Sequence, residues 1–305
     1  MLDRYYWGAV TRISPEAPVP IVEIDSESTR LGGAANVANN IASLGGNPVL
    51  IGVVGSDQAG ADLRSLVKKL QFDGTGIFQD SSRPTTIKTR VIAHHQHVVR
   101  IDQETRSGIA SETQRCIIDF LSQRIDSIDA IIFQDYNKGV VVSELIHEVI
   151  RIARSKQKII TVDPKFENFF EYQDVTLFKP NRKESEEALG IRLTDPKSIE
   201  RAGHDLLKRL RAEHVLLTLG EHGMALFSND SEVKFVANKA RNVADVSGAG
   251  DTVISTLTLA MAAGANVEEA ATLSNYAAGI VCGEVGIVPI DRNVLHQTIL
   301  QDGGK

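Results

Sequence analysis

DAIIFQD (129–135) and KIITVD (158–163) are two short, uninterrupted apolar runs, and each closes on an aspartate. Further runs of this kind lie at 49–55, 175–180 and 214–220. Amphipathic stretches of helical period separate them, at 57–70, 111–125, 143–155, 183–189 and 198–210. Strands without polar alternation, joined by helices, predict a mostly parallel sheet that is covered on both faces. We therefore expect an α/β fold whose ligand site lies at the carboxyl ends of the strands.

Two segments depart from this rhythm, VPIVEID (19–25) and TTIKTRVIAHHQHVVRID (85–102). They alternate polar and apolar residues, as half-exposed antiparallel strands do. They predict a small separate sheet, with strands at about 17–30 and 84–103, inserted in a single domain of residues 1–305. The second segment contains His94, His95 and His97 without a nearby cysteine or glutamate, which favours a surface or interface patch over a metal site.

Composition argues against a nucleic-acid-binding, a membrane-spanning and a disulfide-stabilised protein. The 305 residues carry 33 Lys and Arg against 39 Asp and Glu, a net charge of −6, so any anionic ligand must be held by local groups and nucleic acid is not expected as a partner. No apolar run approaches the ~20 residues of a membrane helix, and the first residues lack a signal-peptide pattern. The two cysteines form neither a disulfide framework nor a zinc site. We expect a soluble, cytoplasmic protein.

DVSGAGDT (245–252) is the motif with the clearest chemistry, and a helix-length run of small and apolar residues follows it. Gly248 and Gly250 allow a tight turn, and the unpaired N–H groups at the start of a helix form a cradle for phosphate. An aspartate inside such a cradle repels the anion. Asp251 is therefore interpreted as a base that takes the proton from a hydroxyl attacking the phosphate. The alternative is an acidic residue that only complements the helix dipole.

Three further segments offer polar groups beside glycine turns or strand ends. In LGGAANVANNIASLGG (31–46), Gly32 and Gly33 lead into a helix that carries Asn36, Asn39 and Asn40, where a neutral polyol could bind; a helix packed on the sheet is the alternative. In KPNRKE (179–184), Asn181 and Glu184 share one face and could hold hydrated Mg²⁺, although an N-terminal capping box fits them better. TLGEHG (218–223) suits a nucleotide loop or a hairpin turn.

Two more turns, DYNKG (135–139) and DPK (163–165), each place an acid and a lysine just past a strand. Metal and phosphate are possible ligands for these residues, and solvated loop charges are the default interpretation.

Taken together, these segments resemble the ribokinase-type (pfkB) carbohydrate kinases, whose two signatures are similar to 32–46 and 245–252. Residues 1–24, both acid–lysine turns and KPNRKESE (179–186) are similar to the kinases of bacterial heptose synthesis in particular. The resemblance covers essentially the whole chain. It implies a ribokinase-like three-layer α/β/α fold with a small β lid that also makes a homodimer. Compared with that family, the chain starts inside the first Gly-Asp turn, so we expect one central strand to be absent, and it ends without a nucleotidyltransferase.

The resemblance also implies roles for individual residues. Asp251 matches the catalytic base, with Gly248, Ala249 and Gly250 as the anion hole. The ATP–Mg²⁺ segment corresponds to Asn181, Arg182, Lys183 and Glu184, with Glu184 acting on the metal through water. The nucleotide loop corresponds to residues 218–223, with Thr218, Gly220 and Gly223. The sugar-binding positions correspond to Asp3, Gly32, Gly33 and Asn36. For a phosphate on the sugar, the candidate cations are Lys88, Arg90 and Arg100, which alternate along the lid strand segment.

The expected reaction is phosphorylation of D-glycero-β-D-manno-heptose 7-phosphate at O1 by ATP, on the route to ADP-heptose and lipopolysaccharide. Another kinase of the same family, acting on ribose, fructose 1-phosphate or a nucleoside, is the alternative within this enzyme class. A catalytically weakened module that binds sugar or nucleotide is the alternative outside it.

Overall fold

The computed structural model describes residues 1–94, 96–229, 231–239 and 243–303, so His95 lies outside the described residues. Its main sheet has six strands in the order β12–β11–β10–β9–β8–β7. Their bounds are β7 Ala130–Gln134, β8 Ile159–Asp163, β9 Leu177–Phe178, β10 His214–Thr218, β11 Met224–Ser228 and β12 Lys234–Val236. Strands β7 to β10 run parallel, whereas β11 and β12 are antiparallel additions at one edge. The predicted α/β class is confirmed.

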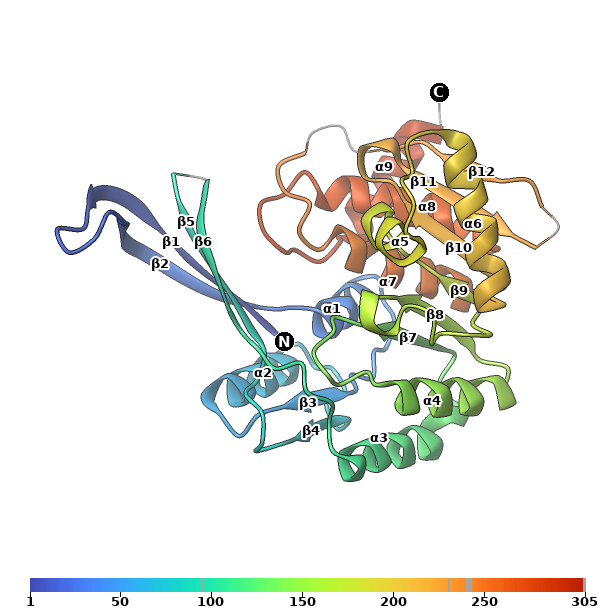
Figure 1. Ribbon diagram of the computed structural model, residues 1–305, viewed down its shortest axis with the longest axis horizontal. Coiled ribbons are helices and arrows are strands. Elements are labelled where there is room, and N and C mark those ends of the chain that lie inside the picture. Colours follow the sequence, from blue (N-terminus) through green and yellow to red (C-terminus); the bar gives the residue numbers. More distant parts are fainter. Residues whose placement is uncertain (95, 230, 240–242, 304–305) are drawn as a thin grey trace.

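Helices cover both faces of this sheet, which makes three layers (Figure 1). One layer contains α3 (Ser111–Arg124), α4 (Ser143–Ser155) and α6 (Pro196–Leu210). The other contains α1 (Ala34–Ser43), α7 (Ala249–Ala262) and α8 (Val267–Val281). Strand β10 shows why its sequence lacks polar alternation: Val215 and Leu217 are buried in the core with α4 and α6, and Leu216 is buried on the other side with α7.

Three further helices and a strand pair complete the body. Helix α5 (Arg182–Leu189) follows β9, and α9 (Arg292–Gly303) packs on α8. Strands β3 (Gly52–Val54) and β4 (Ile77–Gln79) flank α2 (Gln58–Lys69) and form a separate parallel pair. The strand expected over 49–55 is shorter than predicted, because its partner β4 offers only three residues for the ladder. Within the described ranges, no helix is long and apolar enough to cross a bilayer.

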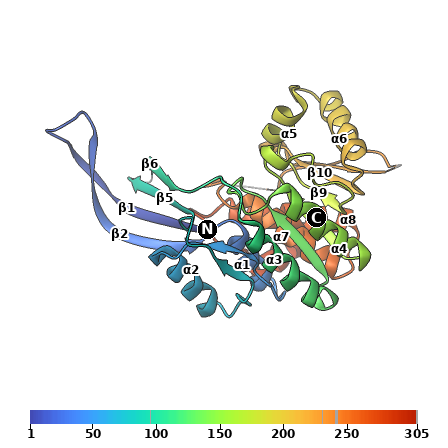
Figure 2. The ribbon, with the colours of Figure 1, turned by 60° about the horizontal axis from the view of Figure 1, so that its bottom comes forward.

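The lid is a four-stranded sheet in the order β2–β1–β5–β6, and it extends away from the body (Figures 1 and 2). Strands β2 (Pro20–Leu31), β5 (Ile87–Ala93) and β6 (Gln96–Gln103) lie in the two alternating segments. Strand β1 (Leu2–Ile13), which the sequence did not assign to this sheet, pairs with both β2 and β5 and is central. His94 and His97 are exposed where β5 turns into β6.

Candidate functional site

Helix α7 begins at a glycine turn and carries Asp251 in its first turn. Gly248 has a φ of +83°, a conformation that glycine adopts without the cost that a Cβ would bring. Among the described residues no side chain caps the start of this helix. Its first N–H groups lack partners within the helix and lie at the positive end of the helix dipole. The turn therefore has the properties of an anion cradle.

The carboxylate of Asp251 is only 3% exposed and accepts three hydrogen bonds. Its Oδ2 accepts from Nδ2 of Asn36, in the first turn of α1, at 2.8 Å. Its Oδ1 accepts from the hydroxyl of Tyr136 at 2.7 Å and from Nε2 of Gln134 at 3.1 Å. Burial raises the pKa of Asp251 to about 6, although the hydrogen bonds from Asn36 and Tyr136 act to lower it. A carboxylate with such a pKa can gain and lose a proton near neutral pH, as a general base must.

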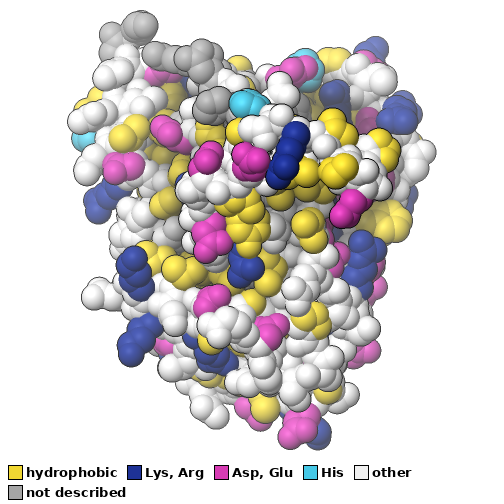
Figure 3. Space-filling model, turned by 90° about the vertical axis from the view of Figure 1, so that its left-hand side faces the viewer, with side chains coloured by type: hydrophobic (Ala, Val, Ile, Leu, Met, Phe, Trp, Pro, Cys, Tyr) yellow, Lys and Arg dark blue, Asp and Glu magenta, His cyan; other side chains and the backbone are white. Residues whose placement is uncertain are grey.

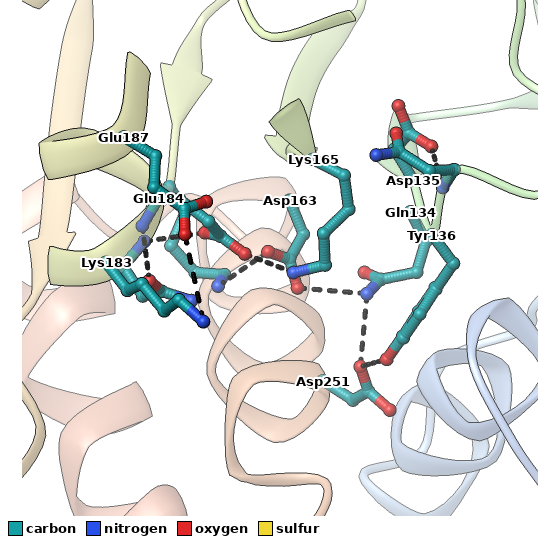
Figure 4. A network of polar contacts seen from close by, with 12 residues as sticks. Gln134, Asp135, Tyr136, Asp163, Lys165, Lys183, Glu184, Glu187 and Asp251 are labelled. Atoms are coloured by element: carbon teal, nitrogen blue, oxygen red, sulfur yellow. Dashed lines mark hydrogen bonds and ion pairs between the residues drawn. The ribbon is translucent and has the colours of Figure 1, made fainter. Parts of the chain in front are cut away.

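The carboxyl ends of the parallel strands supply the groups beside this base (Figure 4). Gln134 ends β7 and donates to Oδ2 of Asp163, the last residue of β8, at 2.9 Å. Lys179 follows β9, is 2% exposed, and donates to Oδ1 of Asp163 at 3.0 Å. A Cβ built on Gly250 would lie 3.7 Å from the Lys179 ammonium. A buried ion pair therefore lies against the first turn of α7.

The segment after β9 forms the capping box that its sequence favoured. Asn181 Oδ1 accepts from the N–H of Glu184 at 2.9 Å, and Glu184 Oε2 accepts from the N–H of Asn181 at 2.8 Å. The other oxygen of Glu184 forms an ion pair with Lys165. Arg182 donates to the carbonyl of Leu193, so its guanidinium serves the local fold. Lys183 is exposed and lies 3.7 Å from Glu187 on the surface of α5.

Residues 218–223 connect β10 to the antiparallel β11, so the hairpin interpretation holds for them. Gly220 and Gly223 have positive φ values of +63° and +81°. A Cβ on Gly223 would lie 2.0 Å from the carbonyl oxygen of Val236, so only glycine fits there. Thr218 bridges to Asn181, which places this hairpin directly beside the capping box.

A cavity of about 100 Å³ lies between the lid and the start of α7. It is lined by Met1, Asp3, Gly33, Lys88, Arg90, Tyr136, Ser247, Gly248, Asp251 and Ile287. Six residues predicted from the sequence therefore meet here, and two more adjoin them: Asn36 contacts Asp251, and Gly32 packs against Asp3.

The three predicted lid cations differ in their surroundings. Arg90 forms an ion pair with the buried Asp3. Lys88 has no carboxylate partner among the described residues, and its ammonium lies 4.9 Å from the centre of the Tyr136 ring. Burial lowers the pKa of Lys88. Arg100 stands opposite Arg90 in the sheet, but its side chain is 60% exposed, pairs with Asp102 and is absent from the cavity lining. The expectation that Arg100 faces the sugar site is not supported.

Sequence reasoning named Asn36 but missed the other two donors to the base, Gln134 and Tyr136, and it did not place Lys165 in the site. Gln134 and Tyr136 lie in or next to the DYNKG turn, and Lys165 lies in the DPK turn, whose charges were expected to be solvated. Lys165 instead points toward the site and forms an ion pair with Glu184. Lys138, in the DYNKG turn, forms an ion pair with Glu104, the residue after β6, at 2.5 Å. Their position in the chain could have identified them, because they lie at or just after the carboxyl ends of parallel strands, where ligands bind in such sheets.

Comparison with known proteins agrees with this geometry. The profile described as pfkB family carbohydrate kinase matches residues 3–291. The "Bifunctional protein HldE" of Desulfatibacillum aliphaticivorans is 44% identical over 302 residues, 99% of this chain and 62% of that protein. Its counterpart in Geobacter sulfurreducens is 43% identical over 94% of this chain and 58% of its own length. The chain thus spans about three fifths of the curated relatives it matches.

Solved structures share the fold. Phosphofructokinase-2 from Escherichia coli, in complex with substrates and products, superposes with a TM-score of 0.81 at 20% identity, over 98% of this chain and 95% of that one. Ribokinase from Arabidopsis thaliana, complexed with ribose and ATP, gives a TM-score of 0.74 at 18% identity, over 97% and 95% of the two chains.

Proposed function

This chain belongs to the pfkB family of carbohydrate kinases, and we propose that it transfers the γ-phosphoryl group of ATP to O1 of D-glycero-β-D-manno-heptose 7-phosphate. The product would be the 1,7-bisphosphate, used in the cytoplasm for ADP-heptose and lipopolysaccharide core synthesis. The observation that carries the reaction type is Asp251, a buried carboxylate in the first turn of α7 whose pKa is raised to about 6. The choice of sugar rests on the motif resemblance and on the similarity to the HldE proteins.

The proposed step is an in-line displacement. The sugar hydroxyl attacks the γ-phosphorus, its proton passes to Asp251, and the bond to the β–γ bridging oxygen breaks, so ADP leaves with the electron pair. The N–H groups from Gly248 to Asp251 would stabilise the charge on the transferring group. The ammonium of Lys179 lies beside Gly250, but it is paired with Asp163, whose carboxylate lies almost equally close to Gly250, so the N–H groups carry this role.

We assign the nucleotide to the neighbouring segments, the capping box of α5 and the hairpin at 218–223. These two segments are joined by the bridge between Asn181 and Thr218. Lys183 is exposed beside them, whereas Arg182 is engaged with a backbone carbonyl and is the weaker candidate.

A magnesium ion fits here only in a hydrated form. Within the described ranges, no three His, Cys, Asp or Glu side chains cluster as metal ligands. Glu184 offers one carboxylate, and both of its oxygens already accept from Lys165 and Asn181. This donor set suits an ion that arrives with the nucleotide phosphates and contacts Glu184 through water. Mg²⁺ bound there would neutralise charge on those phosphates.

The cavity beneath the lid is the proposed acceptor site. Asn36 Oδ1 is buried without a hydrogen-bond partner among the described residues, although the same side chain donates to Asp251. Asn36 does not line this cavity but adjoins it through Asp251, so a sugar hydroxyl bound at Asp251 would lie next to that acceptor and could satisfy it; unpaired buried polar atoms cost free energy. Lys88 supplies the cation for the distal phosphate, since Arg90 already pairs with Asp3.

The lid is the proposed homodimer surface. It exposes large apolar side chains on several strands and turns: Ile13, Val19, Ile24, Val99 and Ile101. Figure 3 views the molecule from the lid side and shows hydrophobic side chains among charged ones. Burial of these side chains against a second copy would remove apolar area from water.

ADP release with a panel of acceptors tests the assignment. The panel contains heptose 7-phosphate, ribose, fructose 1-phosphate and a nucleoside, with Asp251→Asn as the inactive reference. We expect the highest kcat/KM with the heptose phosphate. A clear preference for an unphosphorylated pentose would refute the choice of sugar, and calorimetric sugar binding without ADP production would favour a binding module.

A further inference from the structure

We propose that Tyr136 is a positioning residue for the phosphoryl transfer: with Gln134 it holds Oδ1 of Asp251, so that Oδ2 is the oxygen that takes the proton of the sugar hydroxyl. This inference rests on the proposed function. The proton leaves the hydroxyl for Oδ2, the new O–P bond forms, and the bond to the ADP oxygen breaks.

The two oxygens of Asp251 have unequal surroundings. Oδ1 accepts from both Tyr136 and Gln134, at 2.7 and 3.1 Å, whereas among the described residues Oδ2 accepts from Asn36 alone, at 2.8 Å. A carboxylate oxygen has two lone pairs. Oδ1 is therefore fully engaged, and Oδ2 keeps one lone pair for an incoming hydroxyl. Figure 4 shows Gln134 and Tyr136 converging on the carboxylate from the same side.

Contacts of the Tyr136 ring with Gly33 and two lysines hold the hydroxyl in place. The ring lies 3.3 Å from the Cβ position of Gly33, so the glycine turn leaves just enough room. The ammonium groups of Lys88 and Lys165 lie 4.9 and 5.8 Å from the ring centre, and each is attracted to the aromatic ring.

The backbone before the tyrosine is fixed by a second buried carboxylate. Asp135 is 1% exposed and accepts from the hydroxyl of Tyr172, from Nδ2 of Asn168 and from the N–H of Asn137, at 2.8, 3.0 and 2.8 Å. These bonds tie the turn after β7 to the segment after β8. The hydroxyl of Tyr136 therefore reaches Asp251 from a rigid turn.

The charges around Asp251 decide how its pKa responds to a lost donor. Burial raises the pKa, Asp163 at the end of β8 acts in the same direction, and Lys179 after β9 lowers it. The hydrogen bonds of Asn36 and Tyr136 also lower it. Burial raises the pKa of Tyr136 well above its usual value, so its hydroxyl stays a proton donor at neutral pH. Removing that hydroxyl leaves the Asp251 carboxylate less stabilised.

Tyr136→Phe removes the hydroxyl and keeps the ring. With whichever sugar the wild type phosphorylates, we expect the acid limb of the kcat/KM profile to move up by about one pH unit. At pH 9, where Asp251 is ionised in both proteins, kcat should still be about tenfold lower because Oδ1 keeps only the longer hydrogen bond from Gln134 and the carboxylate is less firmly oriented. The KM for ATP should not change.

Tyr276→Phe is the matched control, because its hydroxyl also donates to a carboxylate, Asp302, at 2.9 Å, and lies outside the site. It should keep the wild-type pH profile. Gln134→Met removes the other donor to Oδ1 and should move the acid limb in the same direction, which covers the case in which Tyr136→Phe fails to fold.

Carbon-13 NMR of the Asp251 carboxyl, assigned with Asp251→Asn, reads the same pKa without any sugar. This separates the inference from the choice of substrate: a wild type inactive on heptose 7-phosphate refutes the proposed function alone. A folded Tyr136→Phe with the wild-type acid limb, plateau kcat and carboxyl pKa would overturn the inference.

Discussion

Asp251→Asn is predicted to make the protein more stable at neutral pH while it abolishes most of the activity. Burial raises the pKa of Asp251 from 3.8 to about 6 in the folded protein. A folded pKa above the unfolded one means that the carboxyl contributes its full stability below pH ~4 and loses it as the pH rises through ~6. Two pKa units correspond to about 3 kcal/mol. That cost is present at pH 7 to 8, and the neutral asparagine does not carry it.

The surroundings of Asp251 accommodate the amide. The asparagine oxygen can accept from Tyr136 and Gln134, as Oδ1 does now. Its NH₂ group would face Asn36, whose own Oδ1 has no partner among the described residues, so a flip of the Asn36 amide restores that hydrogen bond. The flip leaves Asn36 Nδ2 unpaired in place of Oδ1, so the number of unpaired side-chain atoms of Asn36 does not increase.

Thermal unfolding at pH 4 to 8 measures the effect. For a chain of 305 residues, ~3 kcal/mol corresponds to about 5 °C. We expect Tm of Asp251→Asn to exceed that of the wild type by roughly this amount at pH 8, and the difference to shrink toward pH 4. In the same preparation kcat should fall by roughly 10²–10⁴. A Tm difference that does not change with pH would refute the raised pKa, and wild-type turnover would refute the role as base.

Three further substitutions test the sugar site, the packing and the lid. Lys88→Met should raise the KM for heptose 7-phosphate by about 10- to 100-fold, because a charge-assisted contact is lost, whereas Arg100→Met, outside the cavity, should change it less than about threefold. Gly203→Ala should destabilise the protein by about 1–3 kcal/mol in urea unfolding, because its Cβ would lie 2.3 Å from the aromatic ring of Phe227 in β11. Gly52→Ala should not, because no neighbouring atom of the described residues lies within 4 Å of its Cβ position. Ile101→Lys should convert a lid-mediated dimer to monomers in light scattering; a wild type that is already monomeric would refute that surface.

The order of strands and helices in the body could be predicted from the sequence, because each element buries a continuous apolar surface. Helix α5 begins at the box of Asn181 and Glu184, which the sequence favoured. Helix α6 begins at Pro196, two residues before the expected start, at a box of Asp195 and Ser198 that the sequence analysis did not name. Such signals are local: the groups that cap a helix lie within three or four residues of each other. The lid strand β1 was missed because its burial depends on β2 and β5, which lie elsewhere in the chain.

By itself the sequence predicted a glycine turn and an aspartate at the start of α7, because the glycines, the helix start and the acid lie within eight residues of one another. The phosphate cradle is the hypothesis that this local pattern favours. Only the tertiary structure decided which groups control the aspartate. Asn36, Gln134 and Tyr136 come from 215, 117 and 115 residues away. Gln134 and Tyr136 reach the carboxylate from the carboxyl end of β7, where ligands of parallel sheets bind, and Asn36 reaches it from α1, which packs on α7. The tertiary structure also decided which lid cation lines the cavity. Lys88 and Arg100 lie on one face of the lid, but Lys88 reaches the cavity and Arg100 does not.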